Sequence, residues 1–159
     1  MKIKVYSLPE AEQIIEDVRG NWISIRDKGY DELYKKIDEN ADDCLVLYFD
    51  DIDPYGVRNN LVHPFYVKQF ESREPIYFDK EMASDVYGWA ISKKEINIHC
   101  FAGVSRSQAV GHVLNIFFNC LEGNERDFFN SIPGFSMMNP LVVNIMMNVF
   151  KERINGGIA

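Results

Sequence analysis

One stretch of the sequence, from Glu95 to Leu121, restricts the possible folds more than any other. Residues 95–100 have the largely apolar pattern of a strand that is buried inside a sheet. A short loop with a single glycine, Gly103, follows, and residues 107–121 have the pattern of an amphipathic to apolar helix. A buried strand that leads directly into a helix is typical of α/β proteins.

The rest of the chain continues this alternation of strands and helices. Strands are predicted at residues 2–6, 22–25 and 44–49, and helices at residues 8–19, 30–37, 79–92 and 140–151. Residues 44–49 form a continuous apolar run, which favours a strand buried on both faces, whereas residues 57–78 have no clear pattern. We expect a single α/β domain over residues 1–159, with a central, mostly parallel sheet flanked by helices.

Composition excludes several classes of protein. The chain is 47% hydrophobic and 26% charged, which allows a substantial core and excludes disordered and collagen-like classes. A net charge of −7 argues against a nucleic-acid partner, and no apolar run approaches the ~20 residues that a membrane span needs. The N-terminus does not resemble a signal peptide. We therefore expect a soluble, cytoplasmic protein without a membrane or nucleic-acid partner.

The cysteines and histidines predict neither a disulfide framework nor a metal site. The chain has an odd number of cysteines, and these three residues are widely spaced, namely Cys44, Cys100 and Cys120. The spacing of the histidines His63 and His112 does not match that of metal ligands. No metal and no other cofactor is expected. Cys44 and Cys120 are interpreted as core residues, since nothing in their positions supports a redox partnership with Cys100.

The loop between Cys100 and Arg106 has the features of an anion-binding site. Its backbone N–H groups can turn inward at the start of the following helix, and Gly103 permits a close approach of the backbone to a phosphate. Arg106 supplies a planar, two-pronged donor that matches two phosphate oxygens. Cys100 lies at the base of this loop, where its thiolate would be a nucleophile aimed at phosphorus.

The segment from His99 to Ser107 resembles the signature of the cysteine-dependent protein tyrosine phosphatases, and most closely the dual-specificity branch in its small bacterial and phage form. The resemblance implies that Cys100 forms a phosphocysteine, that Arg106 binds the phosphate and that Ser107 assists expulsion of the thiolate. It also implies that His99 orders the loop and favours the thiolate. Backbone N–H groups that bind phosphate are expected from Phe101, Ala102, Gly103, Val104 and Ser105. A chance combination of a strand cysteine, a turn glycine and a surface arginine is the alternative, and so constrained a motif argues against it.

The same resemblance implies an aspartic acid that protonates the leaving oxygen, on the loop after an earlier buried strand. Three acids follow the strand at residues 44–49, namely Asp50, Asp51 and Asp53. We prefer Asp51, with Asp50 second and Asp53 third, because the family pattern there is strand, one residue, then Asp. The other two are interpreted as solvated loop carboxylates, with Asp53 as a turn former before Pro54.

Asn139 and Pro140 resemble, more weakly, the tail of small bacterial and phage members of the same group. Two interpretations stay open. Asn139 lies near the active site, or it starts the last helix, with Pro140 in the first turn.

The function that these features predict is hydrolysis of a phosphomonoester. The loop residues 101–105 carry no cation, whereas phosphoinositide phosphatases of the superfamily tend to place lysines there, so a singly phosphorylated side chain is favoured. The expected partner is a phosphorylated protein or peptide that carries phosphotyrosine, with phosphoserine or phosphothreonine as an open alternative. The sequence makes no prediction of the preference between them. The alternative is a pseudophosphatase, a module that binds a phosphorylated partner without efficient turnover. The sequence makes no prediction of the oligomeric state.

Overall fold

The computed structural model describes residues 1–52, 64–119 and 138–156. Within these residues four strands form one parallel sheet in the order β1-β4-β2-β3. They are β1 (Lys2–Ser7), β2 (Asn21–Arg26), β3 (Asp43–Tyr48) and β4 (Glu95–Cys100). This arrangement confirms the predicted α/β fold with a parallel central sheet.

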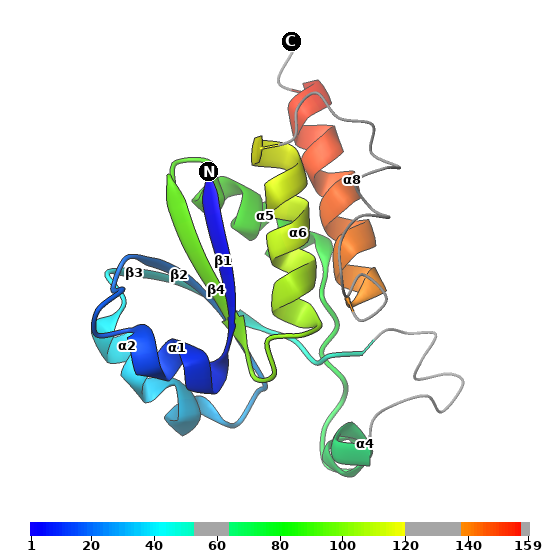
Figure 1. Cartoon of the computed structure of the whole chain (residues 1–159). Helices are drawn as coiled ribbons and strands as arrows, with labels where there is room; N and C mark the ends of the chain where they lie inside the picture. Colours follow the sequence, from blue (N-terminus) through cyan, green and yellow to red (C-terminus); the bar gives the residue numbers. More distant parts are fainter. Residues whose placement is uncertain (53–63, 120–137, 157–159) are drawn as a thin grey trace.

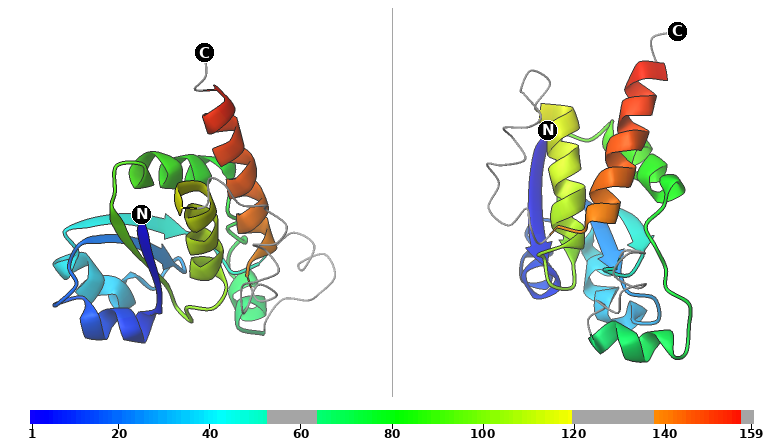
Figure 2. Two further views of the ribbon diagram at one scale, coloured as in Figure 1. Left: turned by 45° about the horizontal axis from the view of Figure 1, so that its top comes forward. Right: turned by 90° about the vertical axis from the view of Figure 1, so that its right-hand side faces the viewer.

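Helices cover both faces of the sheet (Figure 1). On one face lie α1 (Leu8–Ile14), the short 3-10 helix η1 (Asp31–Tyr34) and α2 (Lys35–Asn40). On the other face α5 (Lys80–Ala90), α6 (Arg106–Asn119) and α8 (Pro140–Gly156) pack against one another and the sheet. The short helix α4 (Pro64–Phe70) stands apart from both layers, as the two further views in Figure 2 also show.

The alternation of side chains along each strand builds a separate core on each face of the sheet. Ile23 and Ile25 of β2 and Ile96 and Ile98 of β4 point into the larger core, under α5, α6 and α8. Trp22 points into the smaller core, under α1, η1 and α2. These five side chains are fully buried, and each contributes about 1.5–3 kcal/mol through removal from water.

The first helix begins where the sequence predicts and ends earlier. Ser7 caps α1 in a reciprocal arrangement, because its hydroxyl accepts from the Glu10 amide and the Glu10 carboxylate accepts from the Ser7 amide. The regular helix ends at Ile14, before the predicted end at residue 19.

The prediction that residues 44–49 form a strand is confirmed, but the prediction that this strand is buried on both faces is wrong. The strand is present as β3, but it lies at the edge of the sheet and only Leu47 in it is fully buried. An apolar run alone does not distinguish a central strand from an edge strand whose faces are both partly covered by helices. The central positions belong to β4 and β2.

All four strands run in the same direction, so their carboxyl ends share one edge of the sheet. Cys100 ends β4 and pairs in register with Ser7 at the end of β1, while Asp27 follows β2 and Asp50 and Asp51 follow β3. In open parallel sheets this edge is where ligands bind. None of the helices in the described parts of the chain has the length and apolar character needed to cross a membrane.

Candidate active site

Gly103 folds the loop after β4 tightly against the end of β1. Its φ is +73°, a conformation that favours glycine. A Cβ at this position would lie 2.6 Å from the backbone nitrogen of Ser7, so the space itself also excludes a side chain. Leu8, the residue after Ser7, donates its backbone amide to the carbonyl of Phe101 in the loop at 3.1 Å. The loop is therefore held by β1 as well as by the strand and helix that it joins.

Cys100 lies at the base of this loop with hydrogen-bonding groups around its sulfur. The amide of Gly103 donates to Sγ at 3.2 Å, and the Ser107 hydroxyl is 3.0 Å from the same sulfur. Cys100 is 2% exposed and Ser107 is fully buried. The structure thus brings the predicted nucleophile and the predicted hydroxyl into direct contact, at the start of α6.

Arg106 is buried beside Cys100 and uses one edge of its guanidinium to bind the protein. Nη1 donates to Asp27 Oδ1 at 2.9 Å and to the carbonyl of Phe49 at 2.9 Å, and Nη2 donates to Asp27 Oδ2 at 3.2 Å. Burial opposes the charge of Arg106, but the neighbouring Tyr66, Asp27 and Cys100 outweigh it and raise the pKa of Arg106 above its usual value. The guanidinium is therefore a permanent cation at the base of the site.

The Nε atom of Arg106 has no hydrogen-bond partner among the described residues, although it is buried. Buried donors are nearly always paired, because an unpaired one loses its bonds to water without replacement. An unpaired donor on a buried arginine beside a cysteine therefore points to a ligand that supplies an acceptor.

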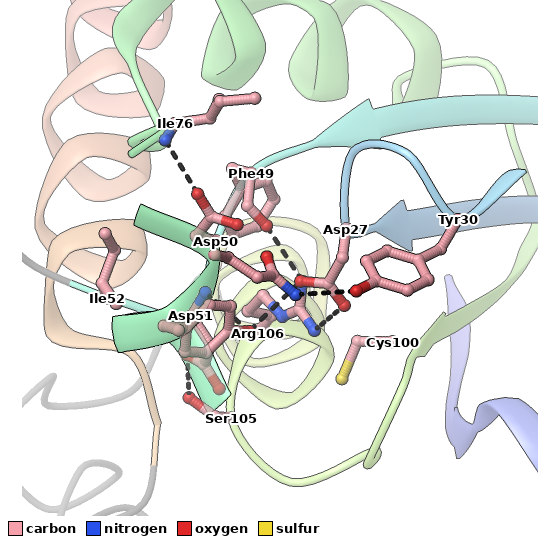
Figure 3. A network of polar contacts seen from close by, with 12 residues as sticks. Asp27, Tyr30, Phe49, Asp50, Asp51, Ile52, Ile76, Cys100, Ser105 and Arg106 are labelled. Carbon is pink, nitrogen blue, oxygen red and sulfur yellow. Dashed lines mark hydrogen bonds and ion pairs between the residues drawn. The ribbon is translucent and has the colours of Figure 1, made fainter. Parts of the chain in front are cut away.

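Asp27 is a site residue that the sequence analysis missed. It is 5% exposed, follows β2 directly and forms the two-pronged ion pair with Arg106 (Figure 3). The available signal was its position, since an acid directly after a strand of a parallel sheet lies at the ligand-binding edge.

The structure separates the roles of the acids after β3. Asp50 is 1% exposed, and its carboxylate accepts two bonds from Arg73, at 2.6 and 2.8 Å, and one from the Ile76 amide at 2.8 Å. It therefore anchors the chain, and it is not among the described residues that line the cavity at Cys100. Asp51 is half-buried and lines the same cavity as Cys100. Asp53 lies outside the described residues.

Two side chains hold the carboxylate of Asp51 by one oxygen. Ser105 donates its hydroxyl to Oδ1 at 2.6 Å and Asn139 donates its Nδ2 to Oδ1 at 3.1 Å, so these two donors leave Oδ2 available for a proton. Asn139 also accepts, through its side-chain oxygen, from the amides of Leu141 and Val142. Both interpretations of Asn139 therefore apply, because it caps α8 and it reaches the candidate acid.

Cys100, Arg106, Asp27 and Asp51 line one cavity of about 360 Å³, together with Tyr66, Phe101 and Ala102. The Phe101 side chain is 54% exposed at this cavity, although it follows a buried cysteine. Val104 is also exposed, while Ser105 turns toward Asp51. The five loop residues thus differ in how their side chains lie, and the loop amide that donates to the sulfur is that of Gly103.

His99 lies on the opposite face of β4 from the preceding and following residues. Its ring packs near Trp22 and Tyr34, and neither ring nitrogen has a hydrogen-bond partner among the described residues. Burial, and then the charge of Arg26, lower its pKa to about 3, so the ring is neutral. In the structure His99 supports the strand by packing, and its ring nitrogens form no hydrogen bond with the described loop residues.

Cys44 is too far from Cys100 to form a disulfide with it. Trp22 of β2 pairs with Cys44 on one side and with Asn97 on the other, which places these two residues about 10 Å apart across the sheet. Cys100 lies three residues farther along β4, about another 10 Å. The resulting separation of about 14 Å exceeds the ~7 Å limit for a disulfide. Burial raises the pKa of Cys44 to about 11, and Cys120 lies outside the described residues.

Comparison with solved structures finds the same fold in phosphatases. The crystal structure of PTPMT1 matches with a TM-score of 0.57 and 14% identity, over 99% of this chain and 94% of that chain. PTPMT1 in complex with PI(5)P matches with a TM-score of 0.57 and 13% identity, over 99% and 95% of the two chains. Tk-PTP in its active form matches with a TM-score of 0.51 and 13% identity, over 95% and 92%.

No family model matches the chain, and no curated protein matches it. At this level of identity the matches show the fold, which is that of the cysteine-dependent protein tyrosine phosphatases, as the resemblance predicted.

Proposed function

We propose that the protein hydrolyses phosphomonoesters in two steps through a phosphocysteine at Cys100, with no metal or cofactor. One observation carries this proposal. The buried Nε of Arg106 lacks a partner among the described residues, and it belongs to a cation that lies next to a buried cysteine. A buried unpaired donor costs about 1–3 kcal/mol, and a phosphate oxygen that accepts from it removes that cost. A phosphate bound there would have its phosphorus beside Sγ.

In the first step the Cys100 thiolate attacks phosphorus, so an S–P bond forms and the bond to the leaving oxygen breaks. Arg106 and the backbone N–H groups of residues 101–105 stabilise the charge on the remaining phosphate oxygens. Asp51 gives its proton to the leaving oxygen.

In the second step a water molecule attacks the phosphocysteine, and the Asp51 carboxylate takes the proton of that water. The S–P bond breaks and inorganic phosphate forms. The Ser107 hydroxyl, 3.0 Å from the sulfur, donates to the thiolate as it leaves.

For the substrate we propose a phosphorylated protein or peptide, with phosphotyrosine preferred and phosphoserine or phosphothreonine second. Among the described residues the cavity is lined by one cation, Arg106, and by the exposed ring of Phe101, which suits a single phosphate on an apolar group. PTPMT1 has been crystallised with PI(5)P, so a phosphoinositide is the competing substrate class. A reactive thiolate is best preserved in a reducing compartment, which favours the cytoplasm.

The test of the reaction is hydrolysis of p-nitrophenyl phosphate in excess EDTA by the wild type and by Cys100→Ser. We expect activity in the wild type that EDTA leaves unchanged, and none in the variant. Activity that survives in Cys100→Ser, or that a chelator abolishes, would contradict the mechanism. If neither protein is active but vanadate still raises the unfolding temperature, the protein is a phosphate-binding module instead.

A second comparison separates the substrate classes. We expect the highest kcat/KM on a phosphotyrosine peptide, a lower value on the matched phosphoserine peptide, and the lowest on vesicles that contain PI(5)P. A preference for the vesicles would replace the protein substrate by a lipid while leaving the phosphocysteine mechanism intact.

A further inference from the structure

Tyr66 of α4 connects the two halves of the candidate site. Its hydroxyl accepts from the backbone amide of Asp51 at 3.2 Å and donates to Asp27 Oδ1 at 3.2 Å. The same Asp27 oxygen accepts from Arg106 at 2.9 Å. A continuous path of hydrogen bonds therefore runs from the phosphate-binding arginine, through Asp27 and Tyr66, to the backbone of the candidate acid.

The direction of these bonds follows from the single proton of the hydroxyl. The Asp51 amide can only donate, so it must face a lone pair of the Tyr66 oxygen, and the hydroxyl proton is left for the Asp27 carboxylate. Burial, and the charge of Asp27 beside it, raise the pKa of Tyr66 above its usual value. Tyr66 is thus a neutral hydroxyl that donates to Asp27 throughout the pH range in which an enzyme of this kind would work.

The helix that carries Tyr66 is fixed to the same loop at a second point. Arg73, three residues after the end of α4, binds the carboxylate of Asp50 and also donates to the side chain of Gln69 at 2.8 Å. Within α4 the ring of Tyr66 stacks on Phe70, with ring centres 5.8 Å apart. Asp50 and Asp51 are therefore both tied to this segment, one through its side chain and the other through its amide.

The acid loop is consequently held from two sides. Ser105 and Asn139 bind the carboxylate of Asp51, while Tyr66 binds its amide and links it to the group that orients Arg106. General acid catalysis requires the acid and the phosphate to keep a set separation, because a displacement of about 1 Å can cost a hundredfold in rate.

We propose that Tyr66 is a positioning residue, which sets the place of Asp51 relative to the phosphate held by Arg106. The proposal rests on the proposed phosphatase function. It assigns a role to α4, which lies in a part of the sequence without a recognisable pattern.

The test removes the hydroxyl alone, in Tyr66→Phe. Asp27 keeps both bonds from Arg106 in this variant, so we expect it to fold. The measured quantity is kcat/KM, which reports the first step alone and not the hydrolysis of the phosphocysteine, in which Asp51 also acts. With phenyl phosphate, whose leaving group needs a proton, kcat/KM should fall about tenfold, a fraction of the 10²–10⁴ that a general acid contributes. With dinitrophenyl phosphate, whose leaving group needs no proton, kcat/KM should change less than about twofold.

A double-mutant comparison distinguishes positioning from a general weakening of the fold. If Tyr66 acts through Asp51, adding Tyr66→Phe to Asp51→Asn should cause no further loss with phenyl phosphate, since the function that Tyr66 supports is already absent. Tyr48→Phe is the matched control. It removes another tyrosine hydroxyl at the same edge of the sheet, one that binds Asp31, and it should leave both substrates unaffected.

Equal losses of kcat/KM with the two substrates, or additive losses in the double variant, would overturn the role of Tyr66. An unchanged kcat/KM with phenyl phosphate would do the same. A wild type that hydrolyses neither substrate would instead refute the phosphatase function itself, so the two failures are distinguishable.

Discussion

Neighbouring residues of the same type have different tasks in this site. Asp50 and Asp51 are adjacent, yet Asp50 is buried in an ion pair with Arg73 and Asp51 faces the cavity. Removing one partner of a buried ion pair leaves the other charge uncompensated, which costs far more than the pair contributes. The two acids are therefore expected to respond differently to the same substitution.

Asp51→Asn should lower kcat for phenyl phosphate by about a hundredfold or more, because the proton donor is lost, with a small effect on stability. Asp50→Asn should lower the free energy of unfolding by about 3 kcal/mol, because Arg73 loses its charged partner. Steady-state kinetics with both substrates and urea unfolding of each variant measure the two effects. The opposite assignment, with Asp50→Asn folded normally but specifically impaired with phenyl phosphate, would make Asp50 the acid.

His99 makes the protein sensitive to acid. Its pKa is lowered to about 3, chiefly by burial, whereas an unfolded chain protonates histidine near 6.5. Above pH 6.5 both states are neutral at this residue and it contributes no pH dependence. Below pH 6.5 the unfolded state binds a proton that the folded state does not, so stability falls by about 1.4 kcal/mol for each pH unit until the pH approaches 3.

His99→Asn removes this titration. Between about pH 7.5 and pH 5, the wild type should lose about 2 kcal/mol more than the variant in its free energy of unfolding. Urea unfolding of both proteins across this range measures the difference, and the contributions of all other shared groups cancel. Parallel pH curves for the two proteins would show that His99 has the same pKa in the folded and unfolded states.

At the scale of elements, the sequence predicts helices, strands and loops best where the local residue pattern agrees with the tertiary surroundings of the segment. The unit from β4 to α6 satisfies both, because its strand lies in the centre of the sheet and its loop can close only with a glycine at position 103. The edge position of β3 was not predictable, since it depends on which strands pair with it. Tyr66 and Arg73 were also missed, because their segment has no periodicity and their roles arise only from contacts with Asp50 and Asp51.

The start of α8 has two roles in one residue, and substitutions at Asn139 can separate them. Asn139→Ala removes both the cap and the donor to Asp51, so it should cost about 1 kcal/mol in stability and also lower kcat for phenyl phosphate. Asn139→Ser retains a good capping side chain but removes the amide donor to Asp51, without adding a charge to this buried position. It should keep most of the stability and lose activity, as urea unfolding and kinetics would show. An Asn139→Ser variant with normal activity would leave Asn139 with the capping role alone.

At the scale of the whole molecule, the parallel sheet gathers into one cavity residues that are far apart in the sequence. Asp27 follows β2, Asp51 follows β3, and Cys100 and Arg106 flank the loop after β4. The buried pair of Asp27 and Arg106 joins β2 to the first turn of α6, so it is both part of the site and part of the framework. Ligand binding should therefore be coupled to global stability through this pair.

Asp27→Ala tests that coupling. The substitution leaves the charge of Arg106 buried without its partner, which should lower the free energy of unfolding by about 3–5 kcal/mol. An anion that binds the folded state alone stabilises it, by about 2.7 kcal/mol when its concentration is a hundred times its Kd. In the wild type a phosphate adds to a cation that is already paired, whereas in Asp27→Ala it supplies the missing negative charge. Phosphate should consequently raise the stability of the variant more than that of the wild type, measured by urea unfolding in phosphate and in chloride at equal ionic strength. Equal stabilisation of the two proteins would mean that the anion does not bind at Arg106.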